Sequence, residues 1–194
     1  MIIGIDIDDT ITKTTEQTDI FAKEYTEKIL KRNFSIDFDT YDPMWARAAY
    51  GWSDEEDREF WNLYYVKEVE IVEPKDNSIE VINELFNENE IILISARWDW
   101  DSGIIQKKTE EWLNNHDVKY HKLFMGHIDK RKICNENNIN LFIDDSLKTC
   151  EEIESIGIKT LLMESRRTKE RDTGNISKVE NWLEIREKIF NKEV

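Results

Sequence analysis

The chain has 194 residues, enough for one domain with an inserted segment, and its 42 acidic and 27 basic residues give a net charge of −15. This charge argues against nonspecific binding to nucleic acid or to anionic membranes, so we expect neither a polynucleotide nor a membrane as a partner. Cys134 and Cys150 lack the spacing of metal ligands, and no apolar stretch reaches the roughly twenty residues of a membrane span. Because Met1 also leads into the first strand without a basic leader, we expect a cytoplasmic protein with reduced thiols.

The first predicted strand, residues 1–5, runs directly into a cluster of acids, Asp6, Asp8 and Asp9. An apolar run of this length, rich in β-branched residues, is typical of a buried parallel strand. Such side chains stay dry until the strand ends, so the acids are expected at the carboxyl edge of a sheet.

The segment 12–77 interrupts the alternation of strands and helices. It contains helical patterns at 20–31 and 54–69 and no convincing buried strand. We expect it to rise over the acidic edge as a helical cap (12–77) on a core formed by 1–11 and 78–194. Its many aromatic residues either form the core of a small subdomain or, in the case of one or two such as Trp45, stack on a planar ring of the substrate.

The remainder of the chain alternates between helices and strands. Helical patterns are predicted for 78–86, with Ser78 helping to begin the first turn, and for 104–113, 130–138 and 179–190. Strands are predicted for 91–94, 141–143 and 158–163. This alternation predicts an α/β fold with a doubly wound parallel sheet covered on both faces. Trp98, Trp100 and Trp112 leave open whether the chain forms a homodimer.

A second pair of acids, Asp144 and Asp145, follows the strand 141–143. Open α/β sheets bind ligands at the carboxyl ends of their strands, so this pair should converge with Asp6 and Asp8. Carboxylates brought together repel one another and require a cation, and we expect Mg²⁺.

These residues resemble a known set of motifs. Asp6-x-Asp8-x-Thr10, Ser95 after the strand 91–94, a lysine at 130 or 132, and Asp144-Asp145 resemble, in order, the four motifs of the haloacid dehalogenase-like (HAD) phosphatases. The helical cap, Ser95-Ala96-Arg97 and the pattern at 179–185 resemble the 5′(3′)-deoxyribonucleotidases and their bacterial relatives. The resemblance implies a HAD-like Rossmannoid core, and it implies that the main-chain carbonyl of Asp8 also binds the metal.

The expected chemistry is the hydrolysis of a phosphomonoester in two displacements. Asp6 is the expected nucleophile and a metal ligand, and it would form an aspartyl-phosphate. Asp8, on the turn after the strand, would act as general acid for the leaving oxygen and then as general base for water. Asp144 and Asp145 would complete the metal site, Asp145 directly or through water.

Four further residues have expected places around the substrate. Ser95 would donate its hydroxyl and backbone N–H to a phosphoryl oxygen at a helix N-terminus. Thr10 would order the turn by hydrogen bonding, and Asp9 would cap the following helix or remain solvated. Ala96 and Arg97 follow Ser95 at the substrate. Arg97 would contact the phosphate or sugar, or instead pair with Asp99 or Asp101.

A lysine is needed to keep Asp6 ionised and to meet the phosphoryl oxygens. Lys130 and Lys132 both qualify, and we favour Lys130 because it opens the helix that precedes the strand 141–143. The basic run 166–171 follows the strand 158–163 at the same edge. It is either a solvated loop or a phosphate-steering patch.

The favoured function is therefore a Mg²⁺-dependent phosphatase of a small phosphomonoester, with nucleoside monophosphates as the best substrate class. Sugar phosphates or other small phosphoesters are the alternative substrates. In a different class of function, the chain is a regulatory or partner-binding protein with vestigial activity, although the intact acids and lysine argue against this. The second acid, Asp8, disfavours a dehalogenase, because only an oxygen leaving group needs it.

Overall fold

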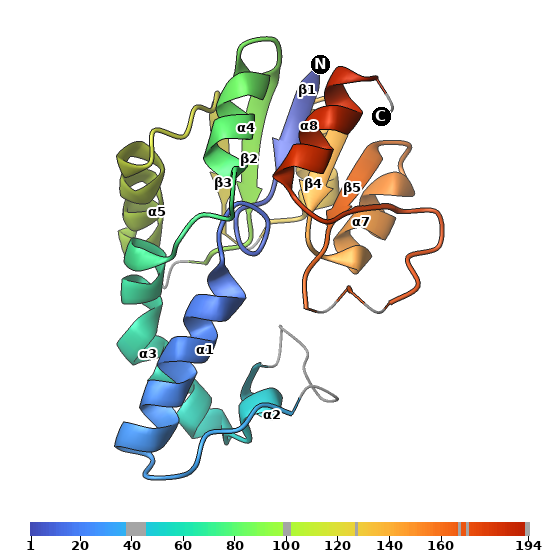
Figure 1. The fold of residues 1–194 in the computed structure, drawn as a ribbon. Helices are drawn as coiled ribbons and strands as arrows, with labels where there is room; N and C mark the ends of the chain where they lie inside the picture. The colour runs from blue at the N-terminus through green and yellow to red at the C-terminus, as the bar shows by residue number, and fades with distance from the viewer. Residues whose placement is uncertain (38–45, 99–101, 127, 167, 170, 193–194) are drawn as a thin grey trace.

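The computed structural model describes residues 1–37, 46–98, 102–126, 128–166, 168–169 and 171–192 (Figure 1). Six parallel strands form one sheet in the order β3-β2-β1-β4-β5-β6. Their bounds are Ile2–Ile5 (β1), Glu90–Ser95 (β2), Lys122–Met125 (β3), Leu141–Asp144 (β4), Lys159–Met163 (β5) and Ser177–Val179 (β6). The predicted doubly wound α/β fold is confirmed.

β1 lies at the centre of the sheet, between β2 and β4. Ile5 is in register with Leu93 of β2 and with Ile143 of β4, and Ile5 is fully buried. Gly4 makes the close approach to β4 possible, since a Cβ atom there would lie 2.6 Å from the ring of Phe142. The strand order reverses between β1 and β4, and such switch points form the crevice in which open α/β sheets bind ligands.

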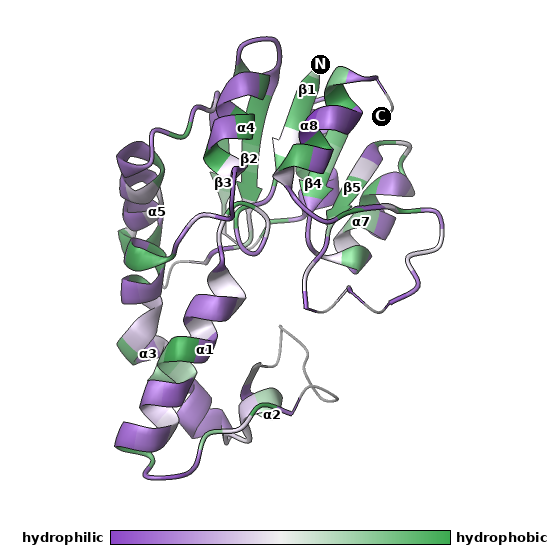
Figure 2. Cartoon of the chain, viewed as in Figure 1, coloured by the Kyte–Doolittle hydropathy of each residue, from purple (hydrophilic) through white to green (hydrophobic). Residues whose placement is uncertain are grey.

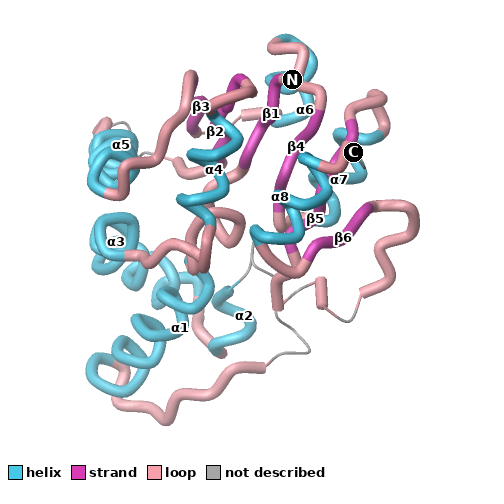
Figure 3. The backbone as a smooth tube through the Cα atoms, turned by 45° about the horizontal axis from the view of Figure 1, so that its top comes forward, coloured by secondary structure: helices cyan, strands magenta, loops and turns pink. Residues whose placement is uncertain are grey.

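Helices cover both faces of the sheet, as Figure 3 shows for α4 and α8 on one face and α6 and α7 on the other. The bounds of these helices are Ser78–Phe86 (α4), Trp182–Phe190 (α8), Lys130–Glu136 (α6) and Leu147–Glu154 (α7). The apolar stripe of each helix packs on the sheet, with Leu85 and Ile185 in one core cluster and Cys134 and Ile153 in another. In Figure 2 the central strands are accordingly hydrophobic.

The helical elements α1 (Thr14–Glu24), the π-helical turn η1 (Tyr25–Ile29), α2 (Ala46–Tyr50) and α3 (Asp54–Ile71) lie between β1 and β2 in the chain. They extend beyond the carboxyl ends of the strands (Figure 1). An isolated bridge between Thr12 and Pro74 brings the two ends of this insertion together. α3 begins with a capping box formed by Ser53 and Glu56 and packs beside α5 (Ile104–Asn115).

The aromatic residues of the insertion form a core of their own. The buried members of this cluster are Phe21, Tyr25, Tyr50, Trp52, Phe60 and Tyr64. Their rings meet mostly at tilted or edge-on angles, with Tyr25 and Trp52 at 5.2 Å between centroids and 83° between planes. The cluster agrees with the prediction that most of these aromatics serve a small core. Tyr41 and Trp45 lie outside the described residues.

Several predicted elements differ from the structure at the edges of the sheet. β3 and β6 were not predicted, because β3 begins with the exposed Lys122 and β6 has only three residues. The closing helix begins at Trp182 rather than at Val179, which belongs to β6, because the side chain of Asn181 accepts from the N–H groups of Leu183 and Glu184.

One smaller expectation is corrected at helix α4, and two of the three tryptophans left open by the sequence are placed. Asn77, in a left-handed conformation, precedes α4, and the hydroxyl of Ser78 is buried without a hydrogen-bond partner among the described residues. Trp112 belongs to the core and donates to the carbonyl of Val72 at 2.8 Å, whereas Trp98 is 40% exposed. Trp100 lies outside the described residues. No helix in the described ranges is long and apolar enough to cross a membrane.

Candidate active site

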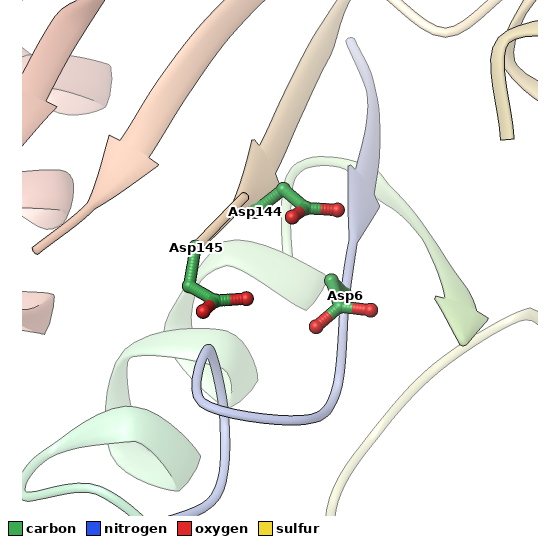
Figure 4. A group of neighbouring side chains, drawn as sticks. All are labelled: Asp6, Asp144 and Asp145. Atoms are coloured by element: carbon green, nitrogen blue, oxygen red, sulfur yellow. The ribbon is translucent and has the colours of Figure 1, made fainter. Parts of the chain in front are cut away.

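Three aspartates gather where the strand order reverses. Asp6 follows β1, Asp144 ends β4 and Asp145 comes next, and Figure 4 shows their carboxyl groups together at the ends of the two strands. The N–H of Asp6 continues the pairing by donating to the carbonyl of Ile143 at 2.9 Å. Carboxylate oxygens of the three aspartates lie within 4.8 Å of one another, and all three residues are buried.

Lys130 joins this cluster from the first residue of α6. Its Nζ atom lies 2.5 Å from Oδ1 of Asp6 and 2.7 Å from Oδ2 of Asp144. Asp129 caps the helix by accepting from the N–H of Lys132, which fixes Lys130 at its start. The side chain of Lys132 is exposed and lies near Glu136 instead. Of the two candidate lysines, the structure therefore brings Lys130 to the aspartates.

The electrostatics of the cluster favour the binding of a cation. Burial, together with the charges of Asp144 and Asp8, raises the pKa of Asp6 to about 7, although Lys130 acts in the opposite direction. Burial opposes the charge of Lys130, but Asp144 and Asp6 outweigh this effect and raise its pKa. One lysine balances only one of the three carboxylates Asp6, Asp144 and Asp145. An oxygen-only donor set with surplus negative charge fits a hard divalent cation such as Mg²⁺.

Asp8 points to a different partner, Arg97. Nη2 of Arg97 lies 2.8 Å from Oδ1 of Asp8, and Nε lies 3.1 Å from Oδ1 and 3.0 Å from Oδ2. Thr14, the first residue of α1, donates its hydroxyl to Oδ1 at 2.8 Å. Burial opposes ionisation of Asp8, but Arg97 and Thr14 outweigh it and hold the pKa of Asp8 below its usual value.

The position of Arg97 corrects the sequence-based expectation. Its guanidinium is buried and engaged with Asp8, and Nη1 donates to the hydroxyl of Thr109 at 3.1 Å. Arg97 is therefore directed at the catalytic turn rather than outward at a substrate. The other suggested partners, Asp99 and Asp101, lie outside the described residues.

The two residues after Asp8 stabilise the turn. Asp9 has a left-handed backbone, and its carboxylate accepts from both the N–H, at 2.8 Å, and the hydroxyl of Thr15. The prediction that Asp9 caps the following helix is confirmed. Thr10 takes part in the turn through its main chain, since its N–H donates to the carbonyl of Ile7 at 3.3 Å, whereas its hydroxyl is buried without a hydrogen-bond partner in the described part of the chain. Its carbonyl accepts from the indole of Trp182 at 2.9 Å.

Ser95 lies at the expected strand end but not at a helix N-terminus. It ends β2 and is fully buried, and its hydroxyl accepts from the N–H of Arg97 at 3.1 Å in a short turn. Helix α5 begins only at Ile104, so no helix among the described residues starts at this motif. Ala96 is exposed beside it. Trp45 lies outside the described ranges.

Four residues of the site were not identified from the sequence: Thr14, Glu68, Thr109 and Tyr65. Glu68 of α3 is 3% exposed, and its Oε2 atom lies 2.8 Å from the hydroxyl oxygen of Thr18. Burial, together with the charges of Asp8 and Asp9, raises the pKa of Glu68 to about 8, although the contact with Thr18 and the charge of Arg97 lower it. Burial, with the charge of Asp8, also raises the pKa of Tyr65. The sequence has no signal that singles out Glu68, since the exposed Glu70 lies next to Val69 in the same way.

The loop after β5 contacts the insertion. Arg166 Nη1 lies 2.7 Å from Oδ2 of Asp19 on α1, and the hydroxyl of Tyr50 donates to Oδ1 of Asp19 at 2.7 Å. Lys178 braces the loop by donating to the carbonyls of Thr168 and Lys169. The first residue of the basic run is thus ordered at the edge of a small polar pocket, lined by Asp9, Thr15, Glu16, Lys75, Ser165 and Arg166.

Comparison with known proteins adds the family context. A family model described as 5′ nucleotidase, deoxy (pyrimidine), cytosolic type C protein (NT5C) matches residues 1–193. Nucleotidase CA_C3379 of Clostridium acetobutylicum is 26% identical over 184 residues, which cover 94% of this chain and 90% of that protein.

Solved structures with the same fold are HAD-superfamily proteins. A haloacid dehalogenase-like hydrolase of Streptococcus pneumoniae matches with a TM-score of 0.64 and 14% identity, over 94% of this chain and 95% of that chain. CbbY of Rhodobacter sphaeroides, solved in complex with phosphate, matches with a TM-score of 0.66 and 13% identity, over 95% and 96%. At these identities the likeness establishes the fold alone.

Proposed function

The chain belongs to the NT5C family of 5′-nucleotidases, and from this premise we propose that it releases phosphate from nucleoside monophosphates through an aspartyl-phosphate on Asp6. As a member of this family it is a HAD-superfamily phosphatase. The observation that carries the proposed mechanism is the meeting of Asp6, Asp144 and Asp145 with Lys130 at the switch point of the sheet. This arrangement supplies a nucleophile and a metal site in one place.

In the first half of the reaction, a carboxylate oxygen of Asp6 attacks phosphorus as the bond from phosphorus to the nucleoside oxygen breaks. Asp8 gives its proton to the leaving oxygen. Arg97 favours the ionised form of Asp8 in the free enzyme, but the negative charge of an incoming phosphate has the opposite effect and favours the protonated acid. Lys130 donates to Asp6 and Asp144 and offers its third N–H group to a phosphoryl oxygen.

In the second half, a water molecule attacks phosphorus and gives its proton to Asp8. The bond between phosphorus and the oxygen of Asp6 breaks, which frees inorganic phosphate and restores the carboxylate. Arg97 stabilises the ionised Asp8 that this step needs as its base. Ser95, at the end of β2, and the exposed Ala96 are placed to line the phosphate side of the site.

We assign Mg²⁺ to the carboxylates of Asp6 and Asp144, with Asp145 bound directly or through water and the main-chain carbonyl of Asp8 as a further ligand. When bound, the ion neutralises charge on the phosphoryl oxygens and orients them for in-line attack. The side chain of Asp8 does not belong to the carboxylate cluster, which leaves it available for proton transfer.

The insertion provides the substrate side of the proposed site. We divide the chain into a catalytic core of residues 1–11 and 78–194 and a helical cap of residues 12–77, whose ends meet at the bridge between Thr12 and Pro74. A cap placed beyond the strand ends would exclude water and contact the nucleoside. The cytosolic type named in the family description supports a cytoplasmic location.

The test is phosphate release from a panel of 5′- and 3′-nucleoside monophosphates, in ribose and deoxyribose forms, and of sugar phosphates. Each substrate is measured with Mg²⁺ and with EDTA. We expect turnover of nucleotides that EDTA abolishes and that Asp6→Asn reduces to background, while Asp76→Asn, which alters an exposed acid paired with Lys13, remains active. Turnover of sugar phosphates alone would show that the substrates are sugar phosphates rather than nucleotides. If the wild type released no phosphate from any substrate of the panel, the proposed reaction would be contradicted.

A further inference from the structure

Arg97 is a buried cation whose donors are directed at the protein itself. Its side chain is 2% exposed, whereas that of Asp8, its partner, is 33% exposed. Nη1 is held by Thr109 on α5, and Nε and Nη2 form a fork on Asp8. Such a fork fixes both the distance and the plane of a carboxylate, which a lysine cannot do.

The two oxygens of Asp8 are held unequally. Oδ1 accepts from Thr14 at 2.8 Å, from Nη2 of Arg97 at 2.8 Å and from Nε at 3.1 Å. Within the described part of the chain, Oδ2 accepts only from Nε, at 3.0 Å. A carboxylate oxygen has two lone pairs, so Oδ1 is saturated and Oδ2 keeps acceptor capacity.

From this asymmetry we infer that Arg97 is a positioning residue for the proposed reaction: with Thr14 it occupies Oδ1 of Asp8 and presents Oδ2 as the oxygen that transfers both protons. The inference rests on the proposed function. In this inference Arg97 makes no contact with the substrate. The hydrogen bond from Arg97 to Thr109 also contributes to positioning, because it sets the direction of the guanidinium.

A positioning residue for Asp8 has a kinetic signature. For a phosphatase of this type, kcat/KM reports the first displacement. In that step the alkoxide that leaves a nucleotide needs a proton, whereas the nitrophenolate that leaves p-nitrophenyl phosphate does not. Arg97→Lys keeps the charge and loses the fork. We expect it to lower kcat/KM for the nucleotide by at least about 10²-fold and that for p-nitrophenyl phosphate by less than about threefold.

A double-mutant cycle tests whether Arg97 acts through Asp8. We expect Asp8→Asn to show the same difference between the two substrates, and the double variant Asp8→Asn with Arg97→Lys to be no slower than Asp8→Asn alone. Thr109→Val, which removes only the anchor, should give a smaller loss of the same kind. Arg186→Lys, which alters an arginine paired with Glu84 on the surface, should leave both substrates unaffected.

Three outcomes would overturn the inference. Equal losses on both substrates with weaker inhibition by inorganic phosphate would make Arg97 a phosphate-binding residue. Additive losses in the double variant, or no change in Arg97→Lys when its melting temperature matches that of the wild type, would also exclude positioning through Asp8. A wild type that hydrolyses neither substrate would instead overturn the proposed function, and the inference with it.

Discussion

Glu68 is a carboxyl group whose proton can be located from its contacts. The hydroxyl of Thr18 lies 2.9 Å from the carbonyl of Thr14 and 2.8 Å from Oε2 of Glu68. A hydroxyl has one proton, and a carbonyl can only accept. If Glu68 is protonated and donates to Thr18, the proton of Thr18 is free for the carbonyl, and both contacts become hydrogen bonds. The pKa of Glu68, which burial raises to about 8, agrees with this arrangement.

The raised pKa of Glu68 predicts a stability that falls as pH rises. Between the unfolded value, near 4.5, and about 8, the folded protein holds a proton that the unfolded chain has lost, so the free energy of unfolding decreases with pH. The loss is on the order of a few kcal/mol. Between pH 5.5 and 8.5, we expect the melting temperature of Glu68→Gln to fall by less than that of the wild type. Glu70→Gln, at an exposed acid of the same helix, should retain the wild-type slope. Parallel slopes in Glu68→Gln and the wild type would show that Glu68 is ionised.

Lys130 and Lys132 form a matched pair for a test of the site. Both are on the first turn of α6, but only Lys130 reaches Asp6 and Asp144. We expect Lys130→Met to lower kcat by at least about 10²-fold, because the charge that faces the phosphoryl oxygens is lost. Lys132→Met should stay within about twofold of the wild type, as surface substitutions usually do. A similar loss in both variants, measured as phosphate release, would contradict the assignment.

The meeting of Asp6 and Asp144 could be predicted from the sequence because it follows from the topology alone. Asp6 and Asp144 each end a buried apolar run, and parallel strands place such ends at one edge. The pairing of Arg97 with Asp8 depends on the path of two loops and on the placement of α5. No spacing in the sequence encodes that path, so the partners expected for Arg97 were the substrate or one of Asp99 and Asp101.

At the scale of elements, an ion pair among the described residues joins the loop after β5 to the insertion. Arg166 and Asp19 form the ion pair, and Tyr50 of α2 donates to the same carboxylate. Since Arg166 is about one-third exposed, such a pair stabilises the fold by about 1 kcal/mol or less. Its effect should therefore be local rather than global.

Arg166→Gln tests this local effect. We expect a melting temperature within a few degrees of that of the wild type, and faster amide hydrogen exchange in α2 and at the start of α1, measured by mass spectrometry. Lys148→Gln, at an exposed lysine of α7, serves as the control. Unchanged exchange in α2 would mean that the ion pair does not hold the insertion to the loop.

The strands that were not predicted share a physical cause. β3 and β6 are the two edges of the sheet, and an edge strand is covered on fewer sides than a central one. β3 therefore has no fully buried residue, and β6 has only Val179. Central strands such as β1 and β4 are buried along almost their whole length. Such strands appear in the sequence as continuous apolar runs, which made them predictable.

For the molecule as a whole, the parallel sheet and α3 could be predicted because each follows from hydrophobic periodicity over many residues. The helix predicted for 20–31 instead begins at Thr14, and the short α2 was not predicted. The side on which the insertion lies could also be predicted, since it leaves the core directly after β1. The contacts between the insertion and the core could not, because they involve single polar side chains such as Glu68 and Asp19.

The whole fold should respond to a divalent cation. Asp6, Asp144 and Asp145 lie where the two halves of the sheet meet. A cation that binds only the folded protein stabilises it by RT ln(1 + [L]/Kd), which is about 2.7 kcal/mol at a hundredfold excess over Kd. We expect Mg²⁺ to raise the melting temperature of the wild type and to do so much less in Asp144→Asn.

The net charge of −15 makes a control for surface screening necessary, because cations also reduce repulsion among exposed acids. NaCl at the same ionic strength measures that effect, and Asp76→Asn, at an exposed acid, should keep the full response to Mg²⁺. If Mg²⁺ stabilised the wild type and Asp144→Asn equally, and no more than NaCl did, the ion would act on the surface and the three aspartates would not be its site. If Mg²⁺ raised the melting temperature only of proteins that keep all three aspartates, the ion would bind at the switch point, and this result would not depend on any measurement of turnover.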